Sequence, residues 1–222
     1  MVTSSTVTLV ARDAIPRDAY VLTRVLTAAL AASPMGGWLE PDPRRRPQSA
    51  LNYIGPLIQQ TIRAGIVRLA EQDGVIVGAA LWSLHSCAGP DSMFTAAANI
   101  EAAREVSRRR WRLDRFTEKH RPVEQHQQLV YLGVHPNRWG QGIGSHLLTR
   151  HHELLHDTGT PAYAVVVDKG CRDVLGQHRY ARIGRHESLA SGALACAMWR
   201  LPRPADRIQS PRTRPPDVRN DL

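Results

Sequence analysis

One stretch of this sequence, VHPNRWGQGIGS at residues 134–145, constrains the fold more than any other. It ends an apolar, strand-like run over 127–134 and leads into a helix-like segment over 142–157, where leucines recur on one face. Three glycines alternate at this junction: Gly140, Gly142 and Gly144. Glycine loses more conformational freedom on folding than any other residue, so its repeated use here needs a reason. The pattern predicts a strand that turns sharply into a helix.

A strand-to-helix junction of this kind is suited to binding an anion. The first turn of a helix presents unpaired N–H groups and the positive end of the helix dipole. Glycines permit unusual backbone angles there and leave no Cβ to keep a phosphate away from those groups. We therefore interpret the turn as a site for a phosphate or pyrophosphate; the alternative is a tight turn without a ligand.

Three kinds of phosphate-binding loop compete for this stretch. The dinucleotide fingerprint G-x-G-x-x-G, counted from Gly140, needs a glycine where Ser145 stands. The Walker loop needs a lysine, and the stretch has none. The acyl-coenzyme A loop reads R/Q-x-x-G-x-G/A after Val-x-Pro. It fits Val134-His135-Pro136 and Gly142-Ile143-Gly144, with Trp139 in the place of the arginine or glutamine.

The rest of the chain alternates between strand-like and helix-like segments. Strands are predicted over 6–10, 66–70, 75–82, 127–134, 163–167 and 193–200, and helices over 19–32, 50–64, 142–157 and 173–182. The segment 86–125 is charged, has a helix pattern between 96 and 116, and is interpreted as an insertion near the acceptor site. This order predicts one domain over 1–202 with a mixed sheet covered by helices, and a disordered basic tail over 203–222.

Composition limits the class of protein and its partners. The net charge of +9 favours anionic partners, but no nucleic-acid-reading motif accompanies it, so nucleic acid is disfavoured. No apolar run is long enough to span a membrane and the first residues lack a secretory signal, so a cytoplasmic protein is expected. The three cysteines, Cys87, Cys171 and Cys196, are far apart, which predicts reduced thiols and no built-in metal site.

In its glycine-rich motif the chain resembles the GNAT superfamily of acyl-CoA-dependent N-acetyltransferases. The matching residues run from Tyr131 through the turn to Leu148. A second match lies downstream, where a helix of the family often reads N-x-x-A-x-x-F-Y-x-x-x-G-F. Tyr180 and Gly184 keep the spacing from tyrosine to glycine, and Asp173 stands in the place of the asparagine. The resemblance implies an α+β fold: a single domain with a central, mixed, mostly antiparallel twisted sheet and helices on both faces.

The resemblance also implies the cofactor and how it is bound. Acetyl-CoA is the expected cosubstrate, with its pyrophosphate on the backbone of the turn. Its pantetheine arm is expected in an opening between the strands 127–134 and 163–167, which a bulge splays apart. The implied cofactor-binding residues are Leu132, Val134, Trp139, Gly140, Gln141, Gly142, Ile143, Gly144, Ser145 and Asp173.

The implied reaction is direct attack of an amine on the thioester, without an acyl-enzyme, so that proximity supplies much of the rate. Tyr180 is the expected acid for the departing thiolate, because a phenol with a pKa of about 10 suits a thiol with a pKa of about 8.5. His126 and Glu124, which lead into the strand 127–134, are the candidates for the general base. No Ser-His-Asp arrangement is visible, which disfavours covalent catalysis.

The sequence leaves the identity of the acceptor amine open. The helices 19–32 and 50–64 and the segment 88–120 are expected to wall its site, in a layout similar to small-molecule acetyltransferases of the puromycin-modifying kind. A small amine, such as a metabolite or an antibiotic, is the first expectation; protein lysines or N-termini are the second, and a non-catalytic acyl-CoA-binding module is the third. The aromatic candidates for lining the site are Trp38, Tyr53, Trp82 and Phe94. The oligomeric state is open, with a homodimer as one option.

Overall fold

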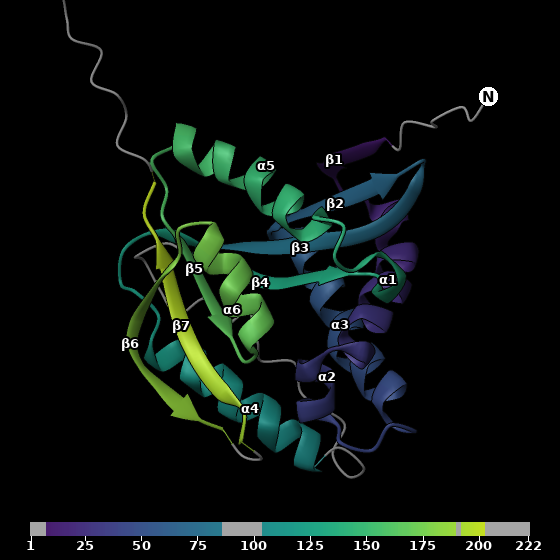
Figure 1. The fold of residues 1–222 in the computed structure, drawn as a ribbon, viewed down its shortest axis with the longest axis vertical. Coiled ribbons are helices and arrows are strands. Elements are labelled where there is room, and N and C mark those ends of the chain that lie inside the picture. Colours follow the sequence, from purple (N-terminus) through teal and green to yellow (C-terminus); the bar gives the residue numbers. More distant parts are fainter. Residues whose placement is uncertain (1–7, 86–103, 190–191, 203–222) are drawn as a thin grey trace, which may run out of the picture.

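The computed structural model describes residues 8–85, 104–189 and 192–202, whose arrangement is shown in Figure 1. The strands are β1 (Leu9–Asp13), β2 (Ile66–Gln72), β3 (Val75–His85), β4 (His126–Val134), β5 (Ala162–Val166), β6 (Ala181–Ser188) and β7 (Leu194–Arg200). The helices are α1 (Ala19–Ala32), α2 (Pro34–Leu39), α3 (Arg46–Ala64), α4 (Arg104–Lys119), α5 (Ile143–Asp157) and α6 (Lys169–Gln177). Short 3-10 turns precede α1 and follow β4, at Pro16–Asp18 and Pro136–Arg138.

The strands form one seven-stranded sheet in the order β1-β2-β3-β4-β5-β7-β6. Every neighbouring pair is antiparallel except β4 and β5, which run parallel. The predicted fold class, α+β with a mixed and mostly antiparallel sheet, is confirmed. Since α5 joins β4 to β5, the glycine turn begins the crossover of the only parallel pair in the described sheet.

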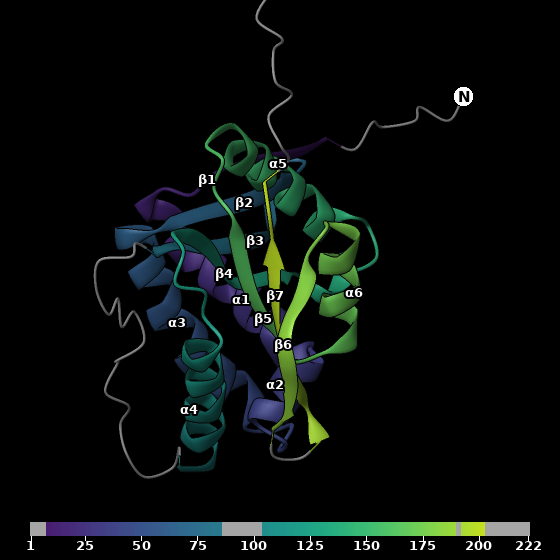
Figure 2. The same cartoon turned by 90° about the vertical axis from the view of Figure 1, so that its left-hand side faces the viewer.

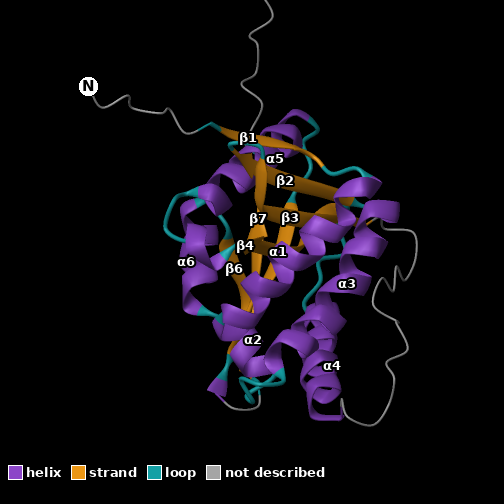
Figure 3. Ribbon diagram, turned by 90° about the vertical axis from the view of Figure 1, so that its right-hand side faces the viewer, coloured by secondary structure: helices purple, strands orange, loops and turns teal. Residues whose placement is uncertain are grey.

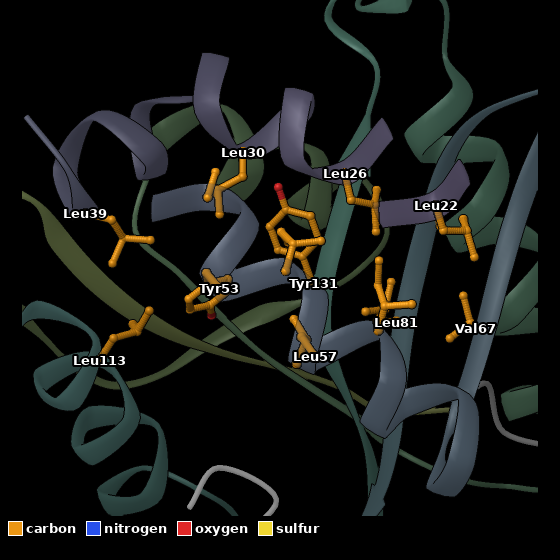
Figure 4. Packing of buried hydrophobic residues seen from close by; sticks show 14 of the residues in the cluster. Leu22, Leu26, Leu30, Leu39, Tyr53, Leu57, Val67, Leu81, Leu113 and Tyr131 are labelled. Atoms are coloured by element: carbon orange, nitrogen blue, oxygen red, sulfur yellow. The ribbon is translucent and has the colours of Figure 1, made fainter. Parts of the chain in front are cut away.

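Helices cover both faces of the sheet, as Figures 1 and 3 show. Helices α1 and α3 pack on one face, and α5 and α6 pack on the other. Along β3, Ala79 and Leu81 belong to the first core while Ala80 and Trp82 belong to the second, because successive side chains of a strand point to opposite faces. Figure 4 shows part of the first core, where leucines of α1 lie next to Tyr131 of β4.

Most predicted elements are confirmed with shifted ends. The helices over 19–32 and 142–157 match α1 and α5, and β1 lies a few residues later than predicted. Helix α3 begins before residue 50 because Pro47 fits the first turn of a helix. The short helix α2 was not predicted; the side chain of Ser33 caps it by accepting the N–H of Gly36 at 3.1 Å.

The prediction of a helix over 173–182 is wrong. The helix in this region, α6, ends at Gln177, and an edge strand, β6, follows where the helix was expected to end. Strand β6 is exposed along most of its length and its pairing with β7 is irregular between Ile183 and Glu187. It therefore lacks the alternation of buried and exposed residues by which a strand is recognised in a sequence.

Several expectations concern residues outside the described ranges. These are the tail over 203–222, the first part of the segment 86–125, Phe94 and Cys87. The second part of that segment contains α4, so the predicted helix is confirmed where the structure describes it. Among the described helices, none has the length and apolar character required to cross a bilayer.

Candidate active site

The sheet opens between β4 and β5. The two strands pair only over residues 127–129 and 162–164, and their ladder does not continue towards the glycine turn. Just beyond this point β4 has a bulge opposite Leu81 and Trp82 of β3, with Val130 as the extra residue. A bulge bends its strand and increases the local twist, which accounts for the divergence of β4 from β5. The splay and the bulge predicted for these strands are both present.

The freed edge of β4 presents backbone groups to this opening. The N–H of His135 donates to the carbonyl of Val77 in β3 at 2.8 Å. Backbone groups alternate sides along a strand, so those of Leu132 and Val134 point away from β3. The indole N–H of Trp139 donates to the Val134 carbonyl at 2.6 Å, which is consistent with that direction. Leu132 and Val134 therefore lie on the edge that faces the opening, as expected for partners of an extended pantetheine chain.

The glycine turn leaves a row of backbone N–H groups without partners. In the described part of the chain, the N–H groups from Gly140 to Ser145 donate no hydrogen bond, and the first helical bond of α5 runs from His146 to the carbonyl of Gly142. Gly140 and Gly142 have left-handed backbones, with φ of 76° and 75°, which glycine adopts without steric cost. The N–H of Trp139 is not part of this row, because it donates to the carbonyl of Pro136 at 3.2 Å.

Neither the backbone conformation nor the packing of the protein requires a glycine at position 144. Its φ is not in the left-handed region, and a Cβ added to it would meet only Leu132 and Val134, at 3.8 and 4.0 Å, which are ordinary contacts. An alanine would favour the helix by about 1 kcal/mol. A glycine that the chain itself does not require suits a position that a ligand approaches closely. Together with the unpartnered N–H groups, Gly144 makes the turn fit the pyrophosphate of an acyl-CoA.

A cleft of about 1260 Å³ extends from the turn along the opening in the sheet. Strands β4 and β5, the turn and the start of α6 line one part of it, and α2, α3 and α4 line the other. Figure 2 shows α2 and α4 at the end of the molecule away from α5. Ligand pockets commonly measure about 300–1,000 Å³, so this cleft has room for an acyl donor and an acceptor together. Trp38 and Tyr53 line it as expected, whereas Trp82 is buried and stacks on His151 instead.

Charged side chains of both signs line the cleft. Arg138 lies in the turn after β4 and Lys169 opens α6, so both cations accompany the backbone groups that suit an anion. Asp114 and Glu118 lie one helical turn apart on α4. Burial raises the pKa of Asp114 to about 6, an effect that Glu118 reinforces and Arg110 opposes. Arg109 of α4 also lines the cleft and donates to the carbonyl of Trp38, and Asp168 lies next to Lys169. The part of the cleft beside α4 therefore has two carboxylates and one guanidinium, and the part beside the turn has two cations and one carboxylate.

Tyr180 is not among the residues that line the cleft, so its position does not support the predicted role as the acid. The residue follows α6 instead of lying on it, and it is 4% exposed in the core beneath α5. Its hydroxyl lies 3.0 Å from Nε2 of His152 on α5. Burial raises the pKa of the phenol well above its usual value of 10. The side chain is thus engaged in the core behind the cleft, in the same cluster as the lining residues Ile143 and Leu175.

The motif matched to Tyr180 and Gly184 fits the structure in a different register. Asp168 caps the start of α6 by accepting the N–H of Cys171 at 2.8 Å. Asparagine is equally favoured at such a cap, so Asp168 can stand in the position of the motif's asparagine. Arg179 has a φ of 66°, the left-handed backbone that a glycine supplies after a helix end. With these two residues aligned, Leu175 stands where the motif has its tyrosine. Leu175 lines the cleft but has no proton to give.

The other predicted residues outside the cleft are Asp173, His126 and Glu124. Asp173 is exposed and pairs with Lys169 at 2.7 Å, so its expected role at the cofactor is not supported. His126 is 1% exposed, and its ring stacks on His85 with centroids 5.1 Å apart. Its Nδ1 lies 2.6 Å from the carbonyl of Glu124, and burial lowers its pKa. Neither base candidate lines the cleft: His126 is buried as the first residue of β4, and Glu124 lies exposed in the loop before that strand.

Sequence reasoning did not place two titratable side chains, Asp114 and Cys171, in the cleft that they line. Asp114 lies in a helix with many charged residues, so its neighbours in the sequence do not distinguish it from a residue on a solvent-exposed face. The only indication that this face of the helix turns inward is the pair of apolar residues beside it, Leu113 and Phe116, which are buried. Cys171 is exposed as a residue, yet burial of its thiol and the nearby Asp168 raise its pKa to about 12. Such a thiol is protonated at neutral pH and is a weak nucleophile, in keeping with direct attack.

Comparison with known proteins agrees with this geometry. The chain matches the model of the acetyltransferase (GNAT) family over residues 29–170. No curated protein matches it. A solved structure from Corynebacterium glutamicum, named histone acetyltransferase HPA2 and related acetyltransferase, is 21% identical with a TM-score of 0.64 and covers 90% of this chain and 99% of its own.

Two further solved structures share the fold. A putative arylalkylamine N-acetyltransferase from the yellow fever mosquito is 11% identical with a TM-score of 0.65, and the match covers 86% of each chain. The ribosomal-protein-S18-alanine N-acetyltransferase of Escherichia coli is 10% identical with a TM-score of 0.56, covering 90% of this chain and 99% of its own. The family match spans more than half of this chain and includes the turn and both splayed strands. The chain therefore belongs to the GNAT family of acetyltransferases and is an acyltransferase.

Proposed function

We propose that this enzyme transfers the acetyl group of acetyl-CoA to a primary amine of a small molecule, a metabolite or an antibiotic, by direct attack in a ternary complex. The observation that carries the proposal is the cleft that connects the unpartnered N–H groups of the turn with a pocket walled by α2, α3 and α4. Both substrates reach the same opening between β4 and β5, so the amine can meet the thioester without an acyl-enzyme.

The donor would be held almost entirely by backbone groups. The N–H groups from Gly140 to Ser145 suit its pyrophosphate, with Arg138 and Lys169 as nearby cations. The freed edge of β4 at Leu132 and Val134 suits the amides of pantetheine. A backbone N–H of that edge is also available to polarise the thioester carbonyl, which develops negative charge as the amine attacks.

The departing thiolate does not require Tyr180. A thiol has a pKa of about 8.5, so its thiolate is a stable leaving group near neutral pH. The proton lost by the attacking nitrogen balances the charge, and it reaches the thiolate or water in the open cleft. Leu175, in the position where the motif has tyrosine, is consistent with a reaction that proceeds without a phenolic acid.

The shape and charge of the acceptor end favour a small amine over a protein. Helix α4 walls that end beside Trp38 and Tyr53. Its carboxylates Asp114 and Glu118 outnumber its one guanidinium there, that of Arg109, which donates to the carbonyl of Trp38. Similar folds carry names of both kinds, including an arylalkylamine N-acetyltransferase, an agmatine N-acetyltransferase and a ribosomal-protein acetyltransferase. Protein lysines or N-termini are therefore the alternative acceptors, and they require a groove that admits an extended peptide.

A non-catalytic acyl-CoA-binding module is the second candidate function. The observation that favours it is that Leu175, which stands where the motif has its tyrosine, carries no phenol, together with the buried position of Tyr180. Under this alternative the protein binds acetyl-CoA and no amine turns over. We prefer the enzyme because the acceptor end contains a pocket, which a module that only binds acyl-CoA does not need.

A thiol-release assay with acetyl-CoA tests these alternatives. Turnover with small amines but not with peptides supports the proposal, and turnover with peptides alone supports a protein acetyltransferase. Binding of acetyl-CoA without turnover of any amine supports the non-catalytic module. A cytoplasmic location remains part of the proposal, in keeping with the free thiols of Cys171 and Cys196.

A further inference from the structure

Helix α4 brings a carboxylate into the acceptor end of the cleft. Asp114 lines the cleft, and its side chain is 28% exposed. Figures 1 and 2 show α4 next to α2, at the end of the molecule away from α5. The glycine turn at the start of α5 lines the same cleft, so Asp114 shares one continuous space with the groups that suit the donor.

Asp114 is the least engaged of the carboxylates in this cleft. Asp168 caps α6, and Glu118 pairs with Arg121 at 2.5 Å. In the described ranges Asp114 has one ion pair, to Nε of Arg110 at 3.8 Å, which is longer than a hydrogen bond. A carboxylate with no hydrogen-bond donor beside it is free to accept one from a ligand.

Arg110 is held away from Asp114 by an aromatic ring. Its guanidinium lies over the ring of Tyr53, 4.9 Å from the centroid, which is a cation–π distance. Tyr53 is fixed in turn by the core that also contains Leu113 and Tyr131, which Figure 4 shows around it. The cation therefore stays close enough to influence Asp114 without neutralising it.

We propose that Asp114 is the general base of the reaction and that it selects amines that enter the cleft as cations. This inference rests on the proposed function and adds the residue that prepares the acceptor. The ammonium donates a proton to the Asp114 carboxylate, and the neutral amine that results attacks the thioester carbonyl. The new C–N bond forms, the C–S bond breaks, and coenzyme A leaves as the thiolate, which takes up the nitrogen's second proton directly or through water.

The surroundings of Asp114 suit this role. Its pKa of about 6 leaves it ionised at neutral pH and brings it closer to the pKa of an amine than an exposed aspartate would be. The groups that act on it are Arg110 and Glu118 of its own helix, and it faces Tyr53 of α3. Arg109 of the same helix also lines the cleft, where its guanidinium donates to the carbonyl of Trp38. Helix α2 and strand β7, which also pack on α4, contribute no titratable side chain to the cleft.

The test is the pH profile of kcat/KM for the full chain with acetyl-CoA and its best small amine. The wild type should lose activity on the acid side with an apparent pKa near 6. Asp114→Asn should lower kcat/KM about 100-fold or more and remove that acid limb, while the Kd for acetyl-CoA stays unchanged. Asp114→Glu should restore part of the activity. Glu153→Gln, which removes an exposed carboxylate on α5, is the matched control and should leave the profile intact.

Arg110→Gln provides an independent readout. Arg110 lowers the pKa of Asp114, so removing its charge should move the acid limb to higher pH. An Asp114→Asn enzyme with wild-type kcat/KM and an unchanged acid limb overturns the inference and leaves the proposed function standing. Absence of turnover by the wild type with every amine overturns the proposed function instead. If Asp114→Asn loses acetyl-CoA binding or its cooperative thermal unfolding, and Asp114→Glu is no better, Asp114 is structural and the inference fails.

Discussion

Nε2 of His178 lies 3.0 Å from Oγ of Ser145, so the end of α6 is joined to the first turn of α5. Burial, with the charge of Arg200 adding to it, lowers the pKa of His178, which keeps the ring neutral at pH 7. A neutral imidazole can donate or accept this hydrogen bond. Because Ser145 ends the row of unpartnered N–H groups, the pair connects the turn to the end of α6, whose first residues line the same part of the cleft.

We expect the Ser145–His178 pair to contribute to acetyl-CoA binding. Ser145→Ala and His178→Ala should each raise the Kd for acetyl-CoA about 5-fold, the effect of losing one hydrogen bond of about 1 kcal/mol. Calorimetric titration measures the effect. In the double variant the Kd should rise no further, since both changes remove the same bond; additive losses would show that the two residues act separately.

Substitutions at two glycines of the turn should affect acetyl-CoA affinity and folding stability differently. Gly144→Ala should leave the Tm unchanged or raise it, because alanine favours the helix, while acetyl-CoA binds at least about tenfold more weakly. Gly142→Ala should lower the free energy of unfolding by about 1 kcal/mol, because its φ of 75° strains a residue with a Cβ. Thermal unfolding and calorimetry distinguish the two effects, and equal acetyl-CoA affinity in Gly144→Ala would contradict the assignment of the turn.

Tyr180→Phe should be a stability variant and not a catalytic one. The change removes the hydroxyl that lies 3.0 Å from His152 and leaves that buried imidazole nitrogen without its partner. We expect the free energy of unfolding to fall by about 1–3 kcal/mol, as measured by urea denaturation. The kcat with the best amine should stay within about twofold of the wild type. A large fall in kcat with unchanged stability would return Tyr180 to the role of the acid.

Acid should destabilise the fold through two neighbouring histidines of α5. Burial lowers the pKa of His151 to about 3 and that of His152 to about 2, so both rings are neutral in the folded protein. The unfolded chain takes up these protons below about pH 6.5, and stability is therefore lost as the pH falls from there towards 3.

At pH 5 the loss should be about 2 kcal/mol for each histidine, which denaturation series at pH 7 and pH 5 would measure. His151→Phe retains a flat ring against Trp82 and removes one titrating group. Its stability should therefore depend less on pH than that of the wild type. An unchanged pH dependence would mean that other groups cause the acid sensitivity.

The sequence predicts the part of the fold in which local pattern and tertiary structure agree. Helix α5 combines an apolar stripe with a glycine start, and β3 is a continuous apolar run, so both could be recognised directly. Strand β6 could not, because it is an exposed edge strand with irregular pairing. The error at α6 has a related cause: Tyr180 and Gly184 have a helix-like spacing, but the left-handed backbone of Arg179 ends the helix before them.

The donor side of the site was also more predictable than the acceptor side. In the proposed complex the donor is bound by backbone groups, whose position follows from a compact motif that includes Gly140 and Gly142. The acceptor side depends on which face of α4 turns inward. In the sequence Asp114 resembles the other charged residues of that helix. Only the tertiary packing of α4, with Leu113 in the core and Arg110 over the ring of Tyr53, determines which face carries Asp114 towards the cleft.

The short ladder between β4 and β5 has a consequence for the whole protein. Only residues 127–129 and 162–164 join the half-sheet β1–β4 to the half-sheet β5–β7–β6, which makes this junction the narrowest seam of the sheet. A donor lying along the freed edge of β4 would act as a missing strand and fasten the two halves together. Acetyl-CoA should then raise the Tm in proportion to the logarithm of its concentration. The cosubstrate would thus stabilise the sheet in addition to supplying the acetyl group.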